Sequence, residues 1–507
     1  MPPPAARESR IPFWAWVALP VLLGAWLRVR HIAAPEPFVD EGANILTALD
    51  VRVRAAFEPL AQGRPWLVYL FKPAGWFPAQ ALAAARLMSA GAGLATLAAL
   101  GWTLHRLAGR AAALGGLWLW AALPFAVFHE RLALQDPFVT ALLAWALALA
   151  TSGSMNGNRR DWPWFIAAGG LLGGAFLLKI SAGFALPWLG LVYLAVQHRA
   201  ARPLFDRRLA FIALGALAPV LTLGTGLLHL GNRLDRYSAL PSLAGAGFLA
   251  SAAARLREWL GYYAGYDGWP LFGLTVVALV LAGRARHSLA LTCAAGWMVS
   301  LLVTALCYHN IFARYVLPDH LPLILFLALA WGPAVAVPGP MRAVALTVFA
   351  AAIAGWGIVS RQIGSDARTA AIPAAEIGQY FTGPWSGRGL DEVRRCLADY
   401  ADQHHVHCLV LTHRFLRPGC YGLMLAELGD PRIGVVPYTL YEPEELAATR
   451  PGLRRINADH GVACFLLYEG SIYPAHPWLD KPDSAMRRVL DVPRGEGEAF
   501  TLYQFEP

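Results

Sequence analysis

Long apolar runs recur along the first two-thirds of the 507-residue chain. A helix of about 20 apolar residues crosses the roughly 30 Å hydrocarbon core of a bilayer. We place such runs at residues 12–29, 79–104, 110–128, 136–151, 162–178, 182–197, 209–230, 269–283, 287–307, 316–336 and 342–360. The pattern predicts a polytopic α-helical membrane domain, with about eleven transmembrane helices, over residues 1–360.

The pattern changes after residue 360, where short alternating segments replace the apolar runs. Alternation of apolar and polar residues indicates strands, and a 3.6-residue period indicates amphipathic helices. Helices are predicted at Leu390–Gln403 and Tyr421–Gly429, and strands at Val406–Thr412, Arg432–Val436, Val462–Tyr468 and Phe500–Gln504. Residues 361–507 are therefore predicted to form a small α/β domain, which follows a turn or mobile loop at residues 381–389.

The arginines predict the orientation of the spans, because short cytoplasmic loops accumulate basic residues. With the N-terminus inside, every predicted inner loop carries arginine: His105–Arg110, Ser152–Asp161, Gln197–Arg208, Gly283–His287 and Pro338–Arg342. An odd number of spans then places the loop after the first span and the C-terminal α/β domain outside the cytoplasm. The expected location is a cell membrane that the chain crosses several times.

Composition supports a membrane protein and argues against nucleic-acid binding. Hydrophobic residues make up 57% of the chain and charged residues only 15%, whereas about 25% of the residues of an ordinary soluble protein are charged. Its net charge of +9 divides into about +13 before residue 361 and about −4 after it. The basic excess therefore flanks the apolar runs, whereas a nucleic-acid-binding protein would carry it on a soluble domain.

Two adjacent carboxylates, Asp40 and Glu41, follow the first apolar run and a Pro35-Glu36-Pro37 break. One interpretation is structural: Asp40 caps an amphipathic helix over Glu41–Ala55. The other is chemical: an external carboxylate takes a proton from an acceptor. A cap accounts for Asp40 but leaves Glu41 unexplained.

Lysine is rare, since of 42 basic residues only Lys72, Lys179 and Lys481 are lysine. The first two fall on predicted external loops, where a compact ammonium is a good ligand for phosphate. The alternative is snorkelling of a long side chain from a helix end.

Further polar residues lie at predicted external ends of the spans. Arg131 precedes Asp136-Pro137, and Asp136 is either a helix cap or a contact to a substrate or metal. Arg314 is suited to grip a phosphate through two parallel hydrogen bonds, and Tyr315 to donate another. Ionisable groups beside a bilayer are costly, so such positions favour a functional site.

These motifs together resemble the GT-C class of membrane glycosyltransferases over roughly residues 12–360. They are Asp40-Glu41 after the first span, Lys72-Pro73 before the second, Arg131 with Asp136-Pro137, Lys179 after the fifth span, and Arg314-Tyr315. The set is most similar to the bacterial branch with protein O-mannosyltransferases and lipid A aminoarabinose transferase. One departure is Ala74-Gly75, where the aminoarabinose branch usually has a second proline after Lys-Pro.

The resemblance implies transfer of a sugar from a polyprenyl-phosphate donor to a lipid, glycan or protein acceptor on the non-cytoplasmic face of the membrane. By the same resemblance Asp40, with Glu41 beside it, activates the acceptor, while Lys72, Lys179 and Arg314 contact the lipid phosphate. Arg131 and Tyr315 are further candidates for that phosphate contact, and Asp136 is a further candidate catalytic carboxylate. The bacterial branch also implies the bacterial inner membrane as the location. Whether a divalent cation joins Asp40, Glu41 and Asp136 is left open, although carboxylates suit Mg²⁺ or Mn²⁺. The competing class is a transporter or flippase for a lipid-linked glycan, which would place charges near mid-bilayer and often show two similar halves.

Two smaller expectations concern the C-terminal domain. The cluster His404-His405-Val406-His407 spans a predicted helix end and strand start, so its side chains should diverge, and a solvated turn is favoured over a metal site. An oxidising compartment allows disulfides, and the predicted helix pair Cys396 and Cys420 is the preferred bridge if one forms. The alternative is that the buried cysteines are simply small apolar residues.

Overall fold

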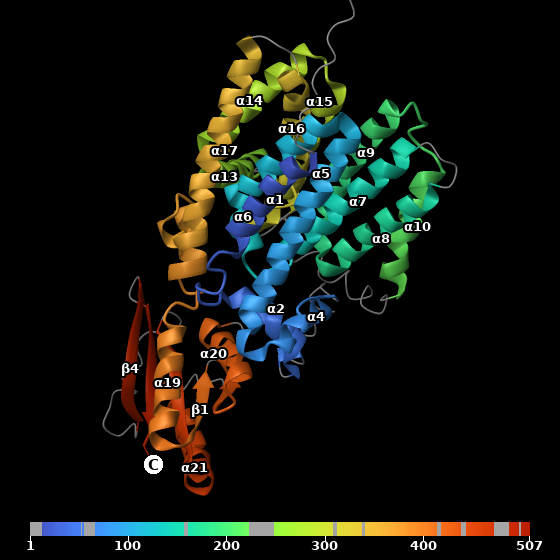
Figure 1. Ribbon diagram of the computed structural model, residues 1–507. Helices are drawn as coiled ribbons and strands as arrows, with labels where there is room; N and C mark the ends of the chain where they lie inside the picture. The colour runs from blue at the N-terminus through green and yellow to red at the C-terminus, as the bar shows by residue number, and fades with distance from the viewer. Residues whose placement is uncertain are drawn as a thin grey trace, which may run out of the picture. The chain divides into compact units, whose positions relative to one another are not determined.

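Figure 1 shows the computed structural model of the chain. It describes residues 13–51, 53–54, 66–156, 161–222, 248–307, 312–336, 340–412, 417–437, 443–470, 486–495 and 498–506. Lys481, the external segment 308–311, the inner-loop residues 157–160 and the predicted span beyond Thr222 lie outside these residues.

The described residues form two compact units. The first consists of residues up to Arg30 and of Ser89–Ala371. The second consists of the described residues within His31–Pro59, Trp66–Met88 and Ile372–Pro507. The division predicted at residue 360 does not describe the whole second unit, because two segments that follow the first apolar helix pack with the C-terminal residues.

The first unit is helical, as the apolar runs predict. Its helices are α1 (Phe13–Val29), α5 (Ala81–Ala122, from Ser89 on), α6 (Pro124–Glu130), α7 (Asp136–Asn156), α8 (Trp162–Leu178), α9 (Leu186–Arg199), α10 (Arg207–Thr222), α13 (Phe248–Tyr266), α14 (Gly268–Arg284), α15 (Ser288–Cys307), α16 (His320–Ala336) and α17 (Pro340–Asp366), with short 3₁₀ turns at Ile180–Ala185, Ala313–Val316 and Ala367–Thr369.

Helix α5 folds back on itself at Gly109. This residue has a φ of 81°, in the left-handed region that glycine adopts without a Cβ clash. As a result Gly101 lies against Leu117, whose Cδ2 is 2.8 Å from where a Cβ on Gly101 would sit. The predicted runs 79–104 and 110–128 are therefore two antiparallel stretches joined at a tight turn.

Five helices in the described part of the chain are long and apolar enough to cross a membrane, or six if the pair Ala250–Tyr266 and Gly268–Arg284, bent by 106°, is one span. That count takes α5 as one helix. Three further apolar helices, Phe13–Val29, Trp162–Leu178 and His320–Pro333, are shorter. The chain is a multi-pass membrane protein, and the number eleven stays a prediction.

Helices α8 and α10 lie side by side in Figure 1 and pack through glycine. A Cβ on Gly169 would collide with the Ile212 carbonyl oxygen, and one on Gly173 with that of Ala216. Gly215 of α10 meets α8 in the same way, at the Ile166 carbonyl oxygen. Small residues let membrane helices approach closely because their backbones come into contact.

The second unit contains one five-stranded sheet in the order β2-β1-β3-β5-β4. Strand β1 (His407–Thr412) pairs in parallel with β2 (Ile433–Pro437) and β3 (Val462–Glu469). Strand β5 (Glu498–Phe505) pairs antiparallel with β3 and with β4 (Met486–Gly495). The four predicted strands are present. Strand β4 was missed, because an edge strand with charged residues and a proline has a weak apolar alternation.

Helices connect the parallel strands of the sheet. They are α20 (Pro418–Gly429) between β1 and β2 and α21 (Pro443–His460) between β2 and β3, and α19 (Leu390–His404) precedes β1. The core under α21 includes Leu411, Cys464, Leu466 and Phe505. Residues 381–389 lie in the short helices and turns before α19, where buried Arg494 donates hydrogen bonds to the carbonyls of Gly383 and Pro384.

Segments from the N-terminal part complete the second unit: α2 (Val39–Leu49), α4 (Leu67–Leu70), the 3₁₀ turns Lys72–Trp76 and Pro78–Gln80, and the first residues of α5, together with α18 (Ala374–Ile377) and a π-helical turn (Gly378–Thr382). Helix α2 packs on α20, where a Cβ on Gly42 would lie 2.6 Å from the Tyr421 Cβ. The helix that bears Asp40 therefore rests on the α/β fold.

The predicted disulfide between Cys396 and Cys420 is wrong, because both thiols are free. Cys408 and Cys464 are free too, although their strands β1 and β3 are neighbours as expected. Burial raises the pKa of the Cys408 thiol to about 12 and that of Cys464 to about 11. Buried thiols with such pKa values are inert and pack as small apolar groups.

We expect all four of these cysteines to be alkylated in unreduced, denatured protein. Peptide mass spectrometry measures the label on each site, and a reduced sample is the control that shows complete labelling. A disulfide-linked peptide that contains any of the four would contradict the structure.

Candidate functional site

Lys179 and Asp136 form a buried ion pair in the first unit. The Lys179 Nζ lies 2.6 Å from the Asp136 Oδ1. Lys179 ends α8 because its backbone is extended (φ −158°, ψ 118°), and a 3₁₀ turn follows at Ile180–Ala185. Asp136 is the first residue of α7, and its carboxylate faces the lysine. Two residues separated by 43 positions thus meet where one helix ends and another begins.

An aromatic ring covers the same ammonium. The Lys179 Nζ lies 3.8 Å from the ring centroid of Tyr315, which is a close cation–π contact. The Arg314 guanidinium carbon lies 4.7 Å from the ring centroid of Phe312 and 5.5 Å from that of Tyr315. The 3₁₀ turn Ala313–Val316 positions both of the predicted residues, Arg314 and Tyr315, and Arg314 is buried.

Asp136, Lys179 and Tyr315 line one narrow pocket, together with Asp319. The Asp319 carboxylate accepts a hydrogen bond of 2.9 Å from the Thr304 hydroxyl and another from Ser300. Asp319 was not predicted as a site residue because it falls inside the predicted span 316–336. An acidic residue within an apolar run was the available signal, since such residues usually line a cavity or site.

Arg131 has structural contacts. Its Nη1 donates to the carbonyl oxygens of Leu27 (2.8 Å) and Arg28 (3.1 Å), and its Nη2 donates to that of Gly364 (3.5 Å). These contacts join the end of α1 to α17, and the phosphate contact of Arg131 stays a prediction. Backbone carbonyls at helix ends need such donors when they are buried.

Glu41, in the second unit, forms a buried ion pair with Arg86. Arg86 Nε and Nη2 each lie 2.7 Å from one oxygen of the fully buried Glu41 carboxylate. A Glu41 oxygen also accepts the Phe38 backbone N–H at 3.0 Å. The prediction that Asp40 caps the helix is wrong, because α2 begins at Val39 and Glu41 reaches back to its start.

The same arginine organises the loop before Asp40. Arg86 Nη1 donates to the carbonyls of Ile32 (3.0 Å) and Pro35 (2.7 Å), and Nη2 to that of Glu36 (3.2 Å). Asp40 itself is half-buried on the first turn of α2. Arg86, which lies inside a predicted span, is therefore a clamp for the segment that presents Asp40.

Glu36 and Lys72 lie in the same unit. The Glu36 carboxylate accepts the backbone N–H groups of Gly389 (2.9 Å) and Asp391 (3.0 Å), so it caps α19 from a distant part of the chain. Burial raises the pKa of the Glu36 carboxyl, and these backbone donors oppose that shift. Lys72 is exposed at the start of its 3₁₀ turn.

The structure thus brings together Asp136, Lys179 and Tyr315, with Arg314 adjacent, in the first unit, and describes Asp40, Glu41 and Lys72 in the second. Within the described ranges no group of three or more His, Cys, Asp or Glu side chains is placed to hold a metal ion.

Glu41→Gln is expected to destabilise the second unit by about 3–5 kcal/mol, because it leaves the buried Arg86 guanidinium without its counter-charge. The readout is the apparent unfolding transition of the purified protein in detergent. Arg394→Ala, which breaks an exposed pair with Asp391, is the matched control and should leave the transition unchanged. Equal stability of the Glu41 variant and the parent would contradict the clamp.

Two comparisons with known proteins found similar sequences or folds. Residues 77–225 match the family model described as dolichyl-phosphate-mannose-protein mannosyltransferase. A crystal structure of ArnT from Cupriavidus metallidurans bound to undecaprenyl phosphate is similar over 96% of this chain and 97% of that one, with 16% identity and a TM-score of 0.58. The apo state of that protein is similar over 97% of each chain, with 13% identity and a TM-score of 0.53. No curated protein matches the chain.

Fold and matched family confirm the resemblance to the GT-C class of membrane glycosyltransferases that the sequence predicts. The match to the mannosyltransferase family covers residues 77–225, the part of the chain that contains Arg131, Asp136 and Lys179. Neither comparison supports the transporter alternative.

Proposed function

We propose that this protein is an integral membrane glycosyltransferase that moves a sugar from a polyprenyl-phosphate donor to an acceptor on the non-cytoplasmic face. The observation that carries the proposal is the Lys179–Asp136 pair beside Tyr315, in a pocket of the first unit. The similarity of the fold to a protein crystallised with undecaprenyl phosphate supports the choice of donor.

The charged residues at this pocket are suited to a phosphate leaving group. When the bond between the anomeric carbon and the phosphate oxygen breaks, negative charge develops on the polyprenyl phosphate. A preorganised ammonium and guanidinium stabilise that charge most in a site that excludes water. Lys179 and the buried Arg314 supply these cations, and Tyr315 fixes the ammonium by covering it.

Asp136 acts in this mechanism as the resident counter-ion of Lys179. A buried lysine without a partner would be costly, so the carboxylate keeps the ammonium charged and oriented. The lipid phosphate exchanges with Asp136 for the same ammonium. Asp136 therefore tunes affinity for the carrier lipid, and a lipid that binds less tightly is released faster after transfer.

Asp40 is the proposed general base. It accepts the proton of the acceptor hydroxyl as the oxygen forms its bond to the anomeric carbon, and the polyprenyl phosphate departs. Glu41 supports this step through its bond to Arg86, which fixes the start of α2. Lys72, exposed in the same unit, is proposed as a further phosphate contact.

The arginine-rich inner loops support the proposed orientation, in which Asp40 and the sheet of the second unit lie outside the cytoplasm of a bacterial inner membrane. The test must identify the donor sugar and the acceptor, which is a lipid, a glycan or a protein.

The test compares membrane lipids and cell-envelope glycans by mass spectrometry in cells with and without the protein. We expect loss of one glycan modification and accumulation of a polyprenyl-phosphate sugar in its absence. Cells that carry the Asp40→Asn variant are the control and should show the same change at normal protein levels. Identical lipid and glycan profiles in all three strains would refute the proposed function.

A further inference from the structure

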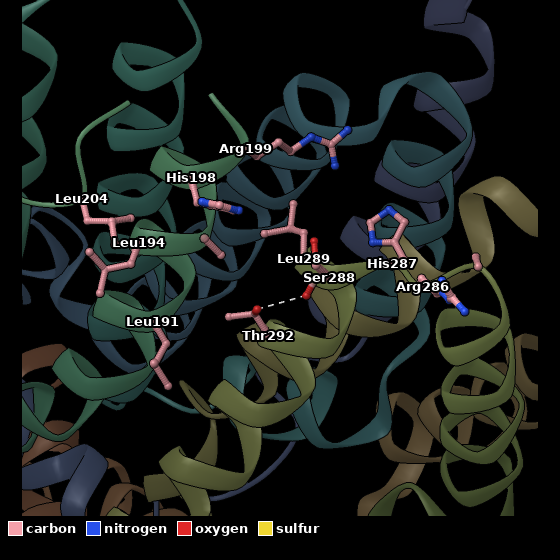
Figure 2. A pocket seen from close by; sticks show the side chains of 12 residues that line it. Leu191, Leu194, His198, Arg199, Leu204, Arg286, His287, Ser288, Leu289 and Thr292 are labelled. Atoms are coloured by element: carbon pink, nitrogen blue, oxygen red, sulfur yellow. Dashed lines mark hydrogen bonds between the residues drawn. The ribbon is translucent and has the colours of Figure 1, made fainter. Parts of the chain in front are cut away.

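A second pocket lies in the first unit between the end of α9 and the start of α15, and Figure 2 shows its lining. Its volume of about 730 Å³ is within the range of ligand sites. One wall is apolar and is formed by Leu191, Leu194, Leu204 and Leu289. Leu204 remains 42% exposed, so this wall has apolar surface left to cover.

The other side of the pocket is basic. His198 and Arg199 come from the last turn of α9, and Arg286 and His287 from the residues just before α15. In Figure 2 His198, Arg199 and His287 lie around the space above Ser288, and Arg286 lies beyond His287. No aspartate or glutamate is among the lining residues. The pocket therefore combines positive charge with an apolar wall.

The nearby carboxylate of Asp161 is paired with arginines outside this pocket. Arg202 and Arg208 both pair with Asp161, at 3.2 Å and 2.7 Å. Among the residues that the structure describes, Arg199 and Arg286 form no such ion pair. Two guanidinium groups at one pocket are thus available to an anion.

His287 adds a directed donor. Its Nδ1 accepts the Ala290 backbone N–H at 3.1 Å, which leaves the hydrogen of the neutral ring on Nε2. Burial, and then the charge of Arg199, lower the pKa of His287, so the ring is a neutral donor beside the arginines. Such a donor is suited to a phosphate oxygen.

The pocket lies at the opposite end of its helices from the Asp136–Lys179 pocket. Helices α9 and α15 pack together. Thr304, near the end of α15, lines the Asp136–Lys179 pocket, whereas Ser288 at its start lines this one. Sixteen helical residues span about 24 Å, which is close to the hydrocarbon thickness of a bilayer. The two pockets therefore face opposite membrane interfaces.

We propose that this basic pocket binds the phosphate of an anionic phospholipid from the leaflet opposite to the one in which transfer takes place. Arg199, Arg286 and His287 contact the phosphate, and an acyl chain lies along Leu191 and Leu194. A free anion would use the guanidinium groups but not the apolar wall. Basic pockets between membrane helices are suited to anionic headgroups for this reason.

The test is native mass spectrometry of the purified full-length protein in detergent, titrated with dioleoyl phosphatidylglycerol or with dioleoyl phosphatidylcholine. We expect tighter binding of phosphatidylglycerol. Arg199→Gln and Arg286→Gln should each weaken it about fivefold, because one arginine near the headgroup is lost. Arg207→Gln is the matched control: it removes the same charge from an exposed position outside the pocket and should leave binding unchanged.

Three results would overturn the proposal. Equal binding of the two lipids would remove the anion preference, and an equal loss in the Arg207 variant would show attraction to general surface charge. Displacement of phosphatidylglycerol by inorganic phosphate at matched concentration would show a site for a free anion. Arg199 and Arg286 are both exposed, so neither substitution is expected to disturb the fold. If one variant is poorly expressed, lipid binding to the other still tests the proposal.

Discussion

Asp40→Asn should lower the rate of sugar transfer by ~10²–10⁴, because the amide keeps the size of the side chain and loses the base that takes the acceptor proton. The expected protein is folded, since asparagine keeps the size of the side chain and the bonds of Glu41 to Phe38 and Arg86 at this helix start are unchanged. The measurement is consumption of a polyprenyl-phosphate sugar by the pure variant, with its unfolding transition recorded alongside.

The matched control for this prediction is Asp391→Asn, which neutralises an exposed carboxylate of the same unit and should transfer at the parent rate. Glu41→Gln separates chemistry from support: it is expected to lose stability and rate together, whereas Asp40→Asn loses rate alone. Parent-like turnover by the Asp40 variant would remove Asp40 from the mechanism.

Lys179→Met should weaken binding of a polyprenyl phosphate about tenfold to a hundredfold, because a charge-assisted hydrogen bond in a buried site is lost. The substitution also leaves Asp136 buried without its partner, so the single variant is expected to be unstable. The double variant Lys179→Met with Asp136→Asn removes both charges and is the form in which binding is measured, by titration with a short-chain polyprenyl phosphate.

Asp136→Asn alone gives the opposite expectation. The variant leaves the buried ammonium without its resident carboxylate, so it should be less stable than the parent in the absence of lipid. The lipid phosphate is then the remaining counter-ion and should bind at least as tightly as to the parent and leave more slowly. If the double variant and the parent bind the lipid equally well, Lys179 does not contact the phosphate. If Asp136→Asn binds as weakly as the double variant, Asp136 is a support for Lys179 and does not compete with the phosphate.

Much of the membrane part followed from local sequence. Apolar runs such as 162–178 became helices with the same limits, because hydrophobicity over 17 or so residues is a property of the segment itself. Helix α13 was missed since Arg255, Arg257 and Glu258 interrupt its apolar character. The strands of the second unit were found where alternation is clear and missed at β4, an edge strand with Arg487, Arg488 and Asp491.

The partners of the candidate site residues could not be predicted from the sequence. The chain supplied the residue types, and their order along it carried the resemblance to the GT-C class. The sequence did not indicate that Arg131 would donate hydrogen bonds to the carbonyls of Leu27 and Arg28. It also did not indicate that Arg86 would pair with Glu41. A guanidinium can donate hydrogen bonds to a phosphate or to a buried carbonyl oxygen. Which acceptor it meets depends on the groups around it in the folded protein.

By itself, then, the sequence determined the location of the apolar helices, the change to an α/β pattern in the C-terminal part, and the set of charged residues that resembles one class of enzyme. The tertiary structure decided the partners. Lys179 meets Asp136 across 43 residues and Arg86 meets Glu41 across 45, through packing that no local period encodes. Buried charges must be paired for the fold to be stable, and which pairs form depends on where helices end in space.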